Sequence, residues 1–135
     1  MISNYEDGIR QESCVGSLIE NVDFINGITA VTAANSPNTF IVDCDIDNNT
    51  NNPSLGYAVQ LTNSPYYFIT DNNFIGNTQP ATIASSAIQI VNCGQDDAFI
   101  SSNTFTGFID GVVTSFFDNG STSPNDPTGA MISCI

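Results

Sequence analysis

The chain has almost no basic side chains: its 135 residues include one arginine, Arg10, and no lysine or histidine. Against 14 Asp and Glu residues this gives a formal net charge of −13 at pH 7. Proteins that bind nucleic acids or anionic membranes neutralise phosphates with clustered Lys and Arg. The composition therefore excludes nucleic acid as an expected partner and argues against binding to an anionic membrane.

Long apolar runs and strong helix formers are also lacking. No stretch approaches the roughly 18 to 20 apolar residues of a membrane span, so membrane insertion is not expected. Residues 1–10 lack the basic start and apolar run of a signal peptide, so any export signal would have been removed or lie outside this sequence. Asn, Thr, Ser, Gly and Ile are abundant beside 41% apolar residues. This predicts one β-rich domain of an extracellular, cell-surface or virion-surface protein.

Apolar and polar residues alternate in five units that can be superposed. Each unit opens with a small residue and a β-branched one: Gly8-Ile9, Ala30-Val31, Ala58-Val59, Ala87-Ile88 and Gly111-Val112. A second landmark follows ten residues after the opener in three units, and insertions delay it in the last two: Leu18, Phe40, Phe68, Phe99 and Met131. The next columns are Ile19, Ile41, Ile69, Ile100 and Ile132, then Val22, Cys44, Asn72, Asn103 and Ile135, then Phe24, Ile46, Phe74 and Phe105. Such alternation indicates period-2 strands with one buried face.

Antiparallel hairpins would also give short strands between Asn, Gly, Ser and Pro turns. The matched columns instead favour parallel strands, one above another, with a spacing of roughly 22 to 31 residues between units. We therefore expect a single all-β domain over 1–135, a single-stranded parallel β-helix of about five coils. The coils are expected at approximately 8–27, 30–56, 58–86, 87–110 and 111–135. Asn72 and Asn103 should stack as an amide ladder at a bend.

The units resemble the repeats of right-handed parallel β-helix proteins, the pectin-lyase-like superfamily, best in 58–77 and 87–108. The resemblance implies the fold and little about activity, since the superfamily holds lyases, hydrolases, tailspikes and adhesins. Neither end carries an amphipathic helix that would cap a solenoid. Uncapped ends expose strand edges, so we expect a segment of a longer solenoid or copies that stack end to end or side by side.

Four cysteines would suit a disulfide reading in an exterior protein. Cys14 and Cys93 occupy equivalent places three units apart, which separates them by about 14 Å, against a limit of about 7 Å between bridged Cα atoms. Cys44 and Cys134 fall in different columns. We expect four reduced cysteines, with loop excursions or a neighbouring chain as the alternative source of partners. Zinc is not expected, because His and C-x-x-C spacing are lacking.

The segment GQDDAFIS, residues 94–101, resembles the paired-Asp motif of polygalacturonases. The resemblance implies that Asp96 and Asp97 could serve an inverting hydrolysis, which needs one protonated carboxyl and one carboxylate that activates water. The rest of that family's site has no match: a further Asp in an Asn-Thr-Asp string, a His and an Arg-x-Lys are missing. Asp71 is a weaker candidate for the missing carboxylate, because stacking of the units could bring it close to Asp96 and Asp97.

Two further groups could bind ligands. Asp43, Asp45 and Asp47 share a strand face and, with Asn21, Asp23, Asp71 and Asn73, would form an oxygen-rich patch suited to Ca²⁺, although a solvated acidic face explains them too. An aromatic column, Phe40, Phe68 and Phe99 with Leu18, would be extended by Tyr66 and Tyr67 as an interaction stripe. It suits a contact between chains or a platform for sugars, with packing under a loop as the alternative.

The sequence thus predicts a non-enzymatic structural β-solenoid that needs no cofactor, with Ca²⁺ as the alternative. Its partners would be copies of itself in a fibre, stalk or adhesin. The alternatives are a polysaccharide-active hydrolase or a fragment of one, using Asp96 and Asp97, and a glycan-binding module using the aromatic column. Sequons at Asn48 and Asn119 would matter only in a glycosylating host.

Overall fold

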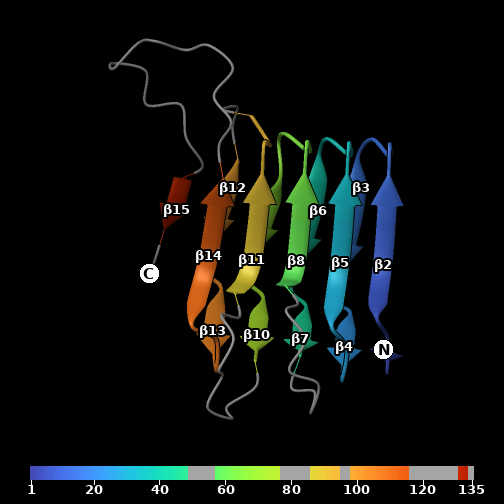
Figure 1. The fold of residues 1–135 in the computed structure, drawn as a ribbon, viewed down its shortest axis with the longest axis vertical. Coiled ribbons are helices and arrows are strands. Elements are labelled where there is room, and N and C mark those ends of the chain that lie inside the picture. Colours follow the sequence, from blue (N-terminus) through green and yellow to red (C-terminus); the bar gives the residue numbers. More distant parts are fainter. Residues whose placement is uncertain (49–56, 77–85, 95–97, 116–130, 134–135) are drawn as a thin grey trace.

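A computed structural model of the chain describes residues 1–48, 57–76, 86–94, 98–115 and 131–133. These residues form strands β1 to β15 and the turns between them, and no helix occurs among them. The strands stack into three parallel sheets whose neighbours come from successive units of the sequence (Figure 1). The expected all-β class and parallel stacking are therefore confirmed for the described residues.

The three sheets are named A, B and C. Sheets B and C take one strand from each of the five repeats, whereas sheet A takes one from each of the first four and one from the residues before them. Sheet A contains β1 (Ile2–Ser3), β4 (Asp23–Ile25), β7 (Asp45–Asp47), β10 (Asn73–Ile75) and β13 (Thr104–Thr106). Sheet B contains β2 (Asp7–Glu12), β5 (Thr29–Ala34), β8 (Tyr57–Thr62), β11 (Ser86–Val91) and β14 (Asp110–Ser115). Sheet C contains β3 (Ser17–Glu20), β6 (Thr39–Val42), β9 (Phe68–Thr70), β12 (Phe99–Ser101) and β15 (Met131–Ser133). The chain runs through one strand of B, then C, then A.

The register of the sheets reproduces the predicted columns. In sheet C, Ile41 pairs with Ile69 and Ile69 with Ile100, while the phenylalanines before them pair in the same way. In sheet B the β-branched residues of the openers are partners, from Ile9 to Val112. A shift of one residue would have moved every side chain to the opposite face. The column predictions are therefore confirmed to the residue where both partners are described.

Inward side chains of the three sheets meet in one apolar core. Its most buried large members are Tyr67, Phe24, Phe74, Ile41, Ile46, Leu61, Ile69, Ile88, Ile90, Ile100, Val31 and Val59. Ala30, Ala58 and Ala87, the small residues of the openers, are also completely buried. Because each repeat contributes only a few of these side chains, the core depends on stacking of repeats rather than on any single one.

The corners between sheets recur at fixed positions with left-handed backbone. The corner from B to C has Ser13, Asn35, Asn63 and Asn92 at φ between 49° and 55°. The corner from C to A has Asn21, Asp43, Asp71 and Ser102 at φ between 52° and 58°. Asn and Asp tolerate this conformation better than other residues with a side chain, which explains why they punctuate the sequence at these intervals.

The structure adds one strand that the repeat pattern did not reveal. Strand β1 precedes the first predicted coil and pairs Ile2 with Phe24 in sheet A. It is only two residues long, too short for a periodicity signal. As for membranes, the part of the chain that the structure describes offers no helix of sufficient length and apolarity to cross one.

Candidate functional site

The predicted amide ladder lies at the corner from sheet C to sheet A and serves the backbone. Asn72 is 2% exposed, and its Oδ1 accepts from the backbone N–H of Cys44 at 2.9 Å. Its Nδ2 donates to the carbonyl of Ile41 at 2.9 Å and to Oδ1 of Asn103 at 3.0 Å. Asn103 repeats the arrangement by accepting from the backbone N–H of Asn72 and donating to the carbonyl of Ile69. These amides are therefore used by the fold.

A second ladder lies at the corner from sheet B to sheet C and contains two of the cysteines. The backbone N–H of Cys14 donates to Oγ of Ser36, that of Ser36 to Oγ of Ser64, and that of Ser64 to Sγ of Cys93. Cys14 and Cys93 are thus in equivalent places three repeats apart, as predicted. Both are free, as is Cys44, whereas Cys134 lies outside the described residues.

The two buried thiols, those of Cys44 and Cys93, have low reactivity. Burial raises the pKa of Cys44 and of Cys93 above the ordinary value of a thiol, against the smaller opposing effect of hydrogen bonds from the backbone. A raised pKa leaves little thiolate at neutral pH, and thiolate is the nucleophile and metal ligand. The third free thiol, Cys14, is exposed.

The proposed calcium ligands are only partly brought together. Asp45 and Asp47 lie on the outer face of β7 on either side of the buried Ile46, and Asp43 occupies the exposed corner before the strand. Asn73 donates to Asp45 at 3.1 Å and so already uses one carboxylate oxygen. Among the described residues no three His, Cys, Asp or Glu side chains gather closely enough to hold a metal ion.

The candidate catalytic pair, Asp96 and Asp97, lies outside the described residues. Asp71, the weaker candidate, ends repeat three of sheet C, where its backbone N–H donates to the carbonyl of Ser101. This register places Ser102 beside it on the following repeat, and Asp43 on the preceding one. Asp71 therefore lies between a serine on the following repeat and a carboxylate on the preceding one.

The aromatic column forms a continuous stack on the outer face of sheet C. The ring centroids of Phe40 and Phe68 are 5.0 Å apart with planes 5° from parallel. Those of Phe68 and Phe99 are 5.2 Å apart at 26°. The rings alternate with the buried isoleucines and are half-buried, while Leu18 at the end of the column is 62% exposed. Because the ring faces lie against each other, the rims of the rings point outward and form a ridge.

The two tyrosines before Phe68 differ from each other, and only Tyr67 departs from the prediction. Tyr67 is 1% exposed and packs in the core, so its assignment to the outer stripe is wrong. In the register of sheet C, its neighbours on the adjacent repeats are Thr39 and Ala98, which are also buried. Burial raises the pKa of the Tyr67 phenol well above its ordinary range, with a smaller contribution from Cys93.

Tyr66 remains a member of the outer surface, with 41% of the residue exposed. Its φ of 59° is left-handed, a conformation that costs a bulky residue about 1 to 2 kcal/mol. The equivalent corner positions of the first two repeats are Gly16 and Asn38, which tolerate it. An exposed aromatic side chain therefore occupies a corner that smaller residues occupy in the first two repeats.

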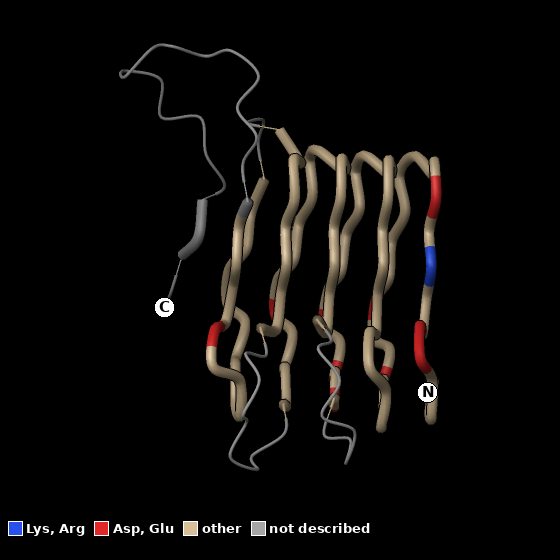
Figure 2. The backbone as a smooth tube through the Cα atoms, viewed as in Figure 1, with Lys and Arg blue, Asp and Glu red and all other residues tan. Residues whose placement is uncertain are grey.

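Charge is distributed unevenly over the three sheets (Figure 2). Strands β5, β8 and β11 of sheet B and β6, β9 and β12 of sheet C contain no Asp, Glu, Lys or Arg. Most of the described carboxylates lie on sheet A, at its corner with sheet C, or in the first repeat: Glu6, Asp7, Glu12, Glu20, Asp23, Asp43, Asp45, Asp47 and Asp71. Among the described residues the central strands of sheets B and C are thus uncharged, while the outer face of sheet A carries carboxylates on β4 and β7.

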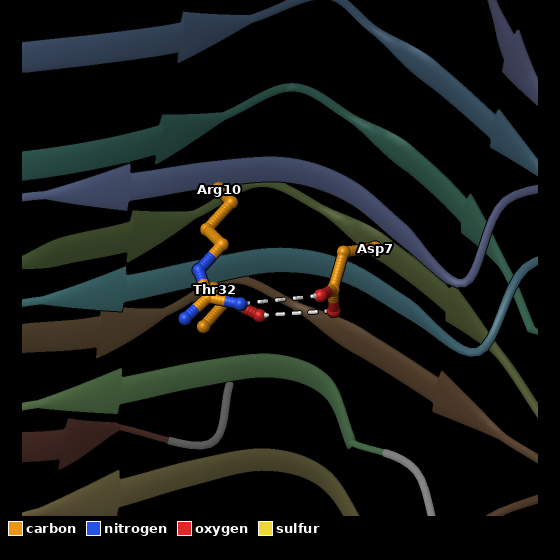
Figure 3. A network of polar contacts seen from close by, with 3 residues as sticks. All are labelled: Asp7, Arg10 and Thr32. Carbon is orange, nitrogen blue, oxygen red and sulfur yellow. Dashed lines mark hydrogen bonds and ion pairs between the residues drawn. The ribbon is translucent and has the colours of Figure 1, made fainter.

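The single arginine belongs to a small exposed network on the first two strands of sheet B. Arg10 lies 4.0 Å from a carboxylate oxygen of Asp7, and Thr32 donates to the other oxygen of that carboxylate at 3.4 Å (Figure 3). The side chains of Arg10 and Asp7 are 67% and 43% exposed, so water screens the pair and its stabilising effect is small. The network offers no enclosed anion site.

Asn48 is half-buried, and its side-chain amide is already hydrogen-bonded within the chain. Its Nδ2 donates to the carbonyl of Ile28 at 2.7 Å, and its Oδ1 accepts from the hydroxyl of Tyr5 at 3.4 Å. A glycan would need that nitrogen. The other two residues of this sequon and the sequon at Asn119 lie outside the described residues.

No protein-family model, no curated protein and no solved structure matches the chain. Inferences about its function therefore rest on the geometry described above.

Proposed function

We propose that the chain is a right-handed parallel β-helix of the pectin-lyase-like type, with a structural rather than enzymatic role. The three parallel sheets and their register support the architecture. Right-handedness follows from a general rule, since connections between parallel strands are right-handed in about 98% of cases. We place the protein outside the cell or on a cell or virion surface, where its acidic face would keep it soluble.

Copies of the chain associate side by side or end to end into a fibre, stalk or adhesin. The observation that carries this proposal is the uncharged outer surface of the central strands of sheets B and C on a chain of net charge −13. Like charges oppose the approach of two copies, so lateral contact needs a face without carboxylates. The central strands of sheets B and C both offer such a surface, bordered by Asp7, Glu12 and Glu20 of the first repeat.

Ring geometry favours assembly over binding of glycans by the aromatic column. A sugar ring packs against the open face of an aromatic ring, whereas each face of Phe68 lies against a neighbouring phenylalanine. The outward rims still present apolar surface, and burying it against another chain releases water. Hydrolysis by Asp96 and Asp97 gains no support from the register at Asp71.

Light scattering coupled to size-exclusion chromatography tests the proposal, with protein from about 10 μM to about 1 mM, the range of weak association. The mean mass should rise with concentration, and negative-stain images should show bundles or rods. Association should strengthen between low and moderate salt, because screening weakens repulsion between acidic copies. Monomers alone at every concentration and salt would refute self-assembly, and release of reducing sugars from an acidic polysaccharide would refute the non-enzymatic role.

A further inference from the structure

We propose that the outer face of sheet C is the lateral contact, and that two copies pack there side by side about a two-fold axis parallel to the direction in which the strands stack. This inference rests on the proposed self-assembly and names its surface. The face consists of β6, β9 and β12 with the corner residue Tyr66.

Two columns of different height make this face complementary to itself. The first is the ridge of Phe40, Phe68 and Phe99. The second, two residues further along each strand, is a lower shelf of Val42, Thr70 and Ser101. A two-fold axis along the stacking direction reverses the strand direction in the facing sheet, so the ridge of each copy lies over the shelf of the other. The contact is then the same from both sides, as a two-fold interface requires.

The shelf can be covered without leaving polar groups unpaired. The hydroxyl groups of Thr70 and Ser101 hydrogen-bond to each other at 3.2 Å. Thr70 also donates to the exposed carboxylate of Asp71 at 3.0 Å. Burial of hydroxyl groups costs little when they already have partners within the same chain. Contact with the phenyl rims therefore removes apolar surface from water at a small polar cost.

Charge selects this orientation over its opposite. Asp43 and Asp71 are exposed at the corner where the shelf ends, and Asn38 and Tyr66 lie at the corner where the ridge begins. In the proposed orientation the acidic corners of the second and third repeats, with Asp43 and Asp71, face Asn38 and Tyr66 of the second copy. In the alternative, with the solenoids antiparallel, ridge would meet ridge and acidic corner would meet acidic corner.

Tyr66 lies where it would add to this contact. It lies at the start of the ridge, 41% exposed, in a backbone conformation that other repeats fill with Gly16 or Asn38. An aromatic ring there extends the ridge over the corner. Tyrosine is among the residues enriched at the centres of interfaces, because a large apolar ring carries a polar end.

Sheets A and B serve less well. The outer face of sheet A carries Asp23, Asp45 and Asp47. Sheet B is uncharged over three strands but presents mainly Thr and Gln side chains, of which Gln60 and Gln89 are paired at 2.7 Å. The strands of sheet C are three or four residues long, so its face is smaller than the about 800 Å² per partner of a stable interface. The contact is therefore weak and concentration-dependent.

The test uses two matched substitutions in the third repeat, Thr70→Glu and Thr62→Glu. Thr70 lies on the shelf of sheet C, in a column where the first repeat has Glu20. Thr62 lies on the outer face of sheet B, in a column where the first repeat has Glu12. Both positions are half-buried, and both columns already accommodate a glutamate. Each variant adds the same charge, so the net charge changes equally. Thr70→Glu also loses the hydroxyl contacts to Ser101 and Asp71, so urea unfolding of both variants checks that the fold is retained.

Sedimentation equilibrium should show association of Thr70→Glu weakened at least about tenfold, since a carboxylate would be buried under a phenyl ridge. Thr62→Glu should stay within about twofold of the parent, the change expected of a charge outside the contact. Phe68→Ser should weaken association as well, with Ile75→Ser on sheet A as its control. Equal effects of the two glutamates, or a larger effect of Thr62→Glu, would overturn the sheet C contact while leaving self-assembly intact. Absence of association in the parent chain would instead overturn the proposed function itself.

Discussion

Replacing Asn72 by alanine tests whether the corner ladders hold the repeats together. The substitution removes the acceptor for the buried N–H of Cys44 and the donors to the Ile41 carbonyl and Asn103. No water can reach a residue that is 2% exposed without opening the corner. The loss therefore leaves buried backbone groups without partners, which costs far more than the net value of a hydrogen bond.

The magnitude follows from the groups left unpaired. A buried donor or acceptor without a partner costs about 1 to 3 kcal/mol, and here one N–H and one carbonyl are affected. The carbonyl retains a second lone pair, so its cost falls at the low end. The free energy of unfolding should decrease by about 3 kcal/mol, which for a denaturant slope of about 2 kcal/mol per molar urea shifts the midpoint by about 1.5 M.

Urea unfolding followed by circular dichroism measures this shift, with Asn73→Ala as the matched control. Asn73 is the next residue but lies on the outer face, where its amide joins Asp45 to Thr104 through exposed hydrogen bonds. Its loss should change the free energy of unfolding by no more than about 0.5 kcal/mol. If the two alanine variants were equally stable, the buried amide ladder would not be a principal source of cohesion between repeats.

The remaining predictions concern ionisation and thiol reactivity. Burial raises the pKa of the Tyr67 phenol above 10.0 and that of the Cys93 thiol above 9.0, so their contribution to stability is complete below those values and is lost as the unfolded state ionises above them. Thermal melts should therefore show stability falling from about pH 9 upward, less steeply in Tyr67→Phe; an equal slope would contradict the linkage. In native protein, iodoacetamide should label Cys14 rapidly and leave Cys44 and Cys93 unlabelled until urea is added, as peptide mass spectrometry can verify; early labelling of either buried thiol would contradict its placement.

Much of the fold could be predicted because residues that contact each other in a stacked structure recur at regular intervals in the sequence. The column of Ile41, Ile69 and Ile100 was visible as a motif and is buried in the structure. The exposed corners could be recognised because Asn and Asp recur at matching positions, and these residues tolerate the left-handed backbone of a corner. The amide ladder followed from two asparagines in one column. In each case, one position of the repeat requires one type of residue, and that residue type was the signal.

Alternation failed where the chain turns. Tyr66 and Tyr67 are neighbours, and reading them with Phe68 as one outward stripe ignored the left-handed residue between two strands. A left-handed corner resets which side chains face inward, so the period-2 rule holds only within a strand. The column that contains Tyr67 was a better signal of burial, because its neighbours on the adjacent repeats, Thr39 and Ala98, are small enough to be buried. Asp96 and Asp97 remain a prediction from their sequence alone.

The gathering of carboxylates on sheet A was predicted from the sequence as an oxygen-rich patch, because Asp23 and Asp45 occupy matching places in neighbouring units. Asp23 pairs with Asp45 in sheet A, one strand spacing apart. In water two such charges repel by about 0.8 kcal/mol, and salt reduces this further, so a hydrated sheet A tolerates them. Covering that sheet with a second acidic chain would remove the water that makes the repulsion small. The same stacking that concentrates the carboxylates on sheet A therefore leaves sheets B and C as the faces available for contact, and of these only sheet C presents an apolar ridge.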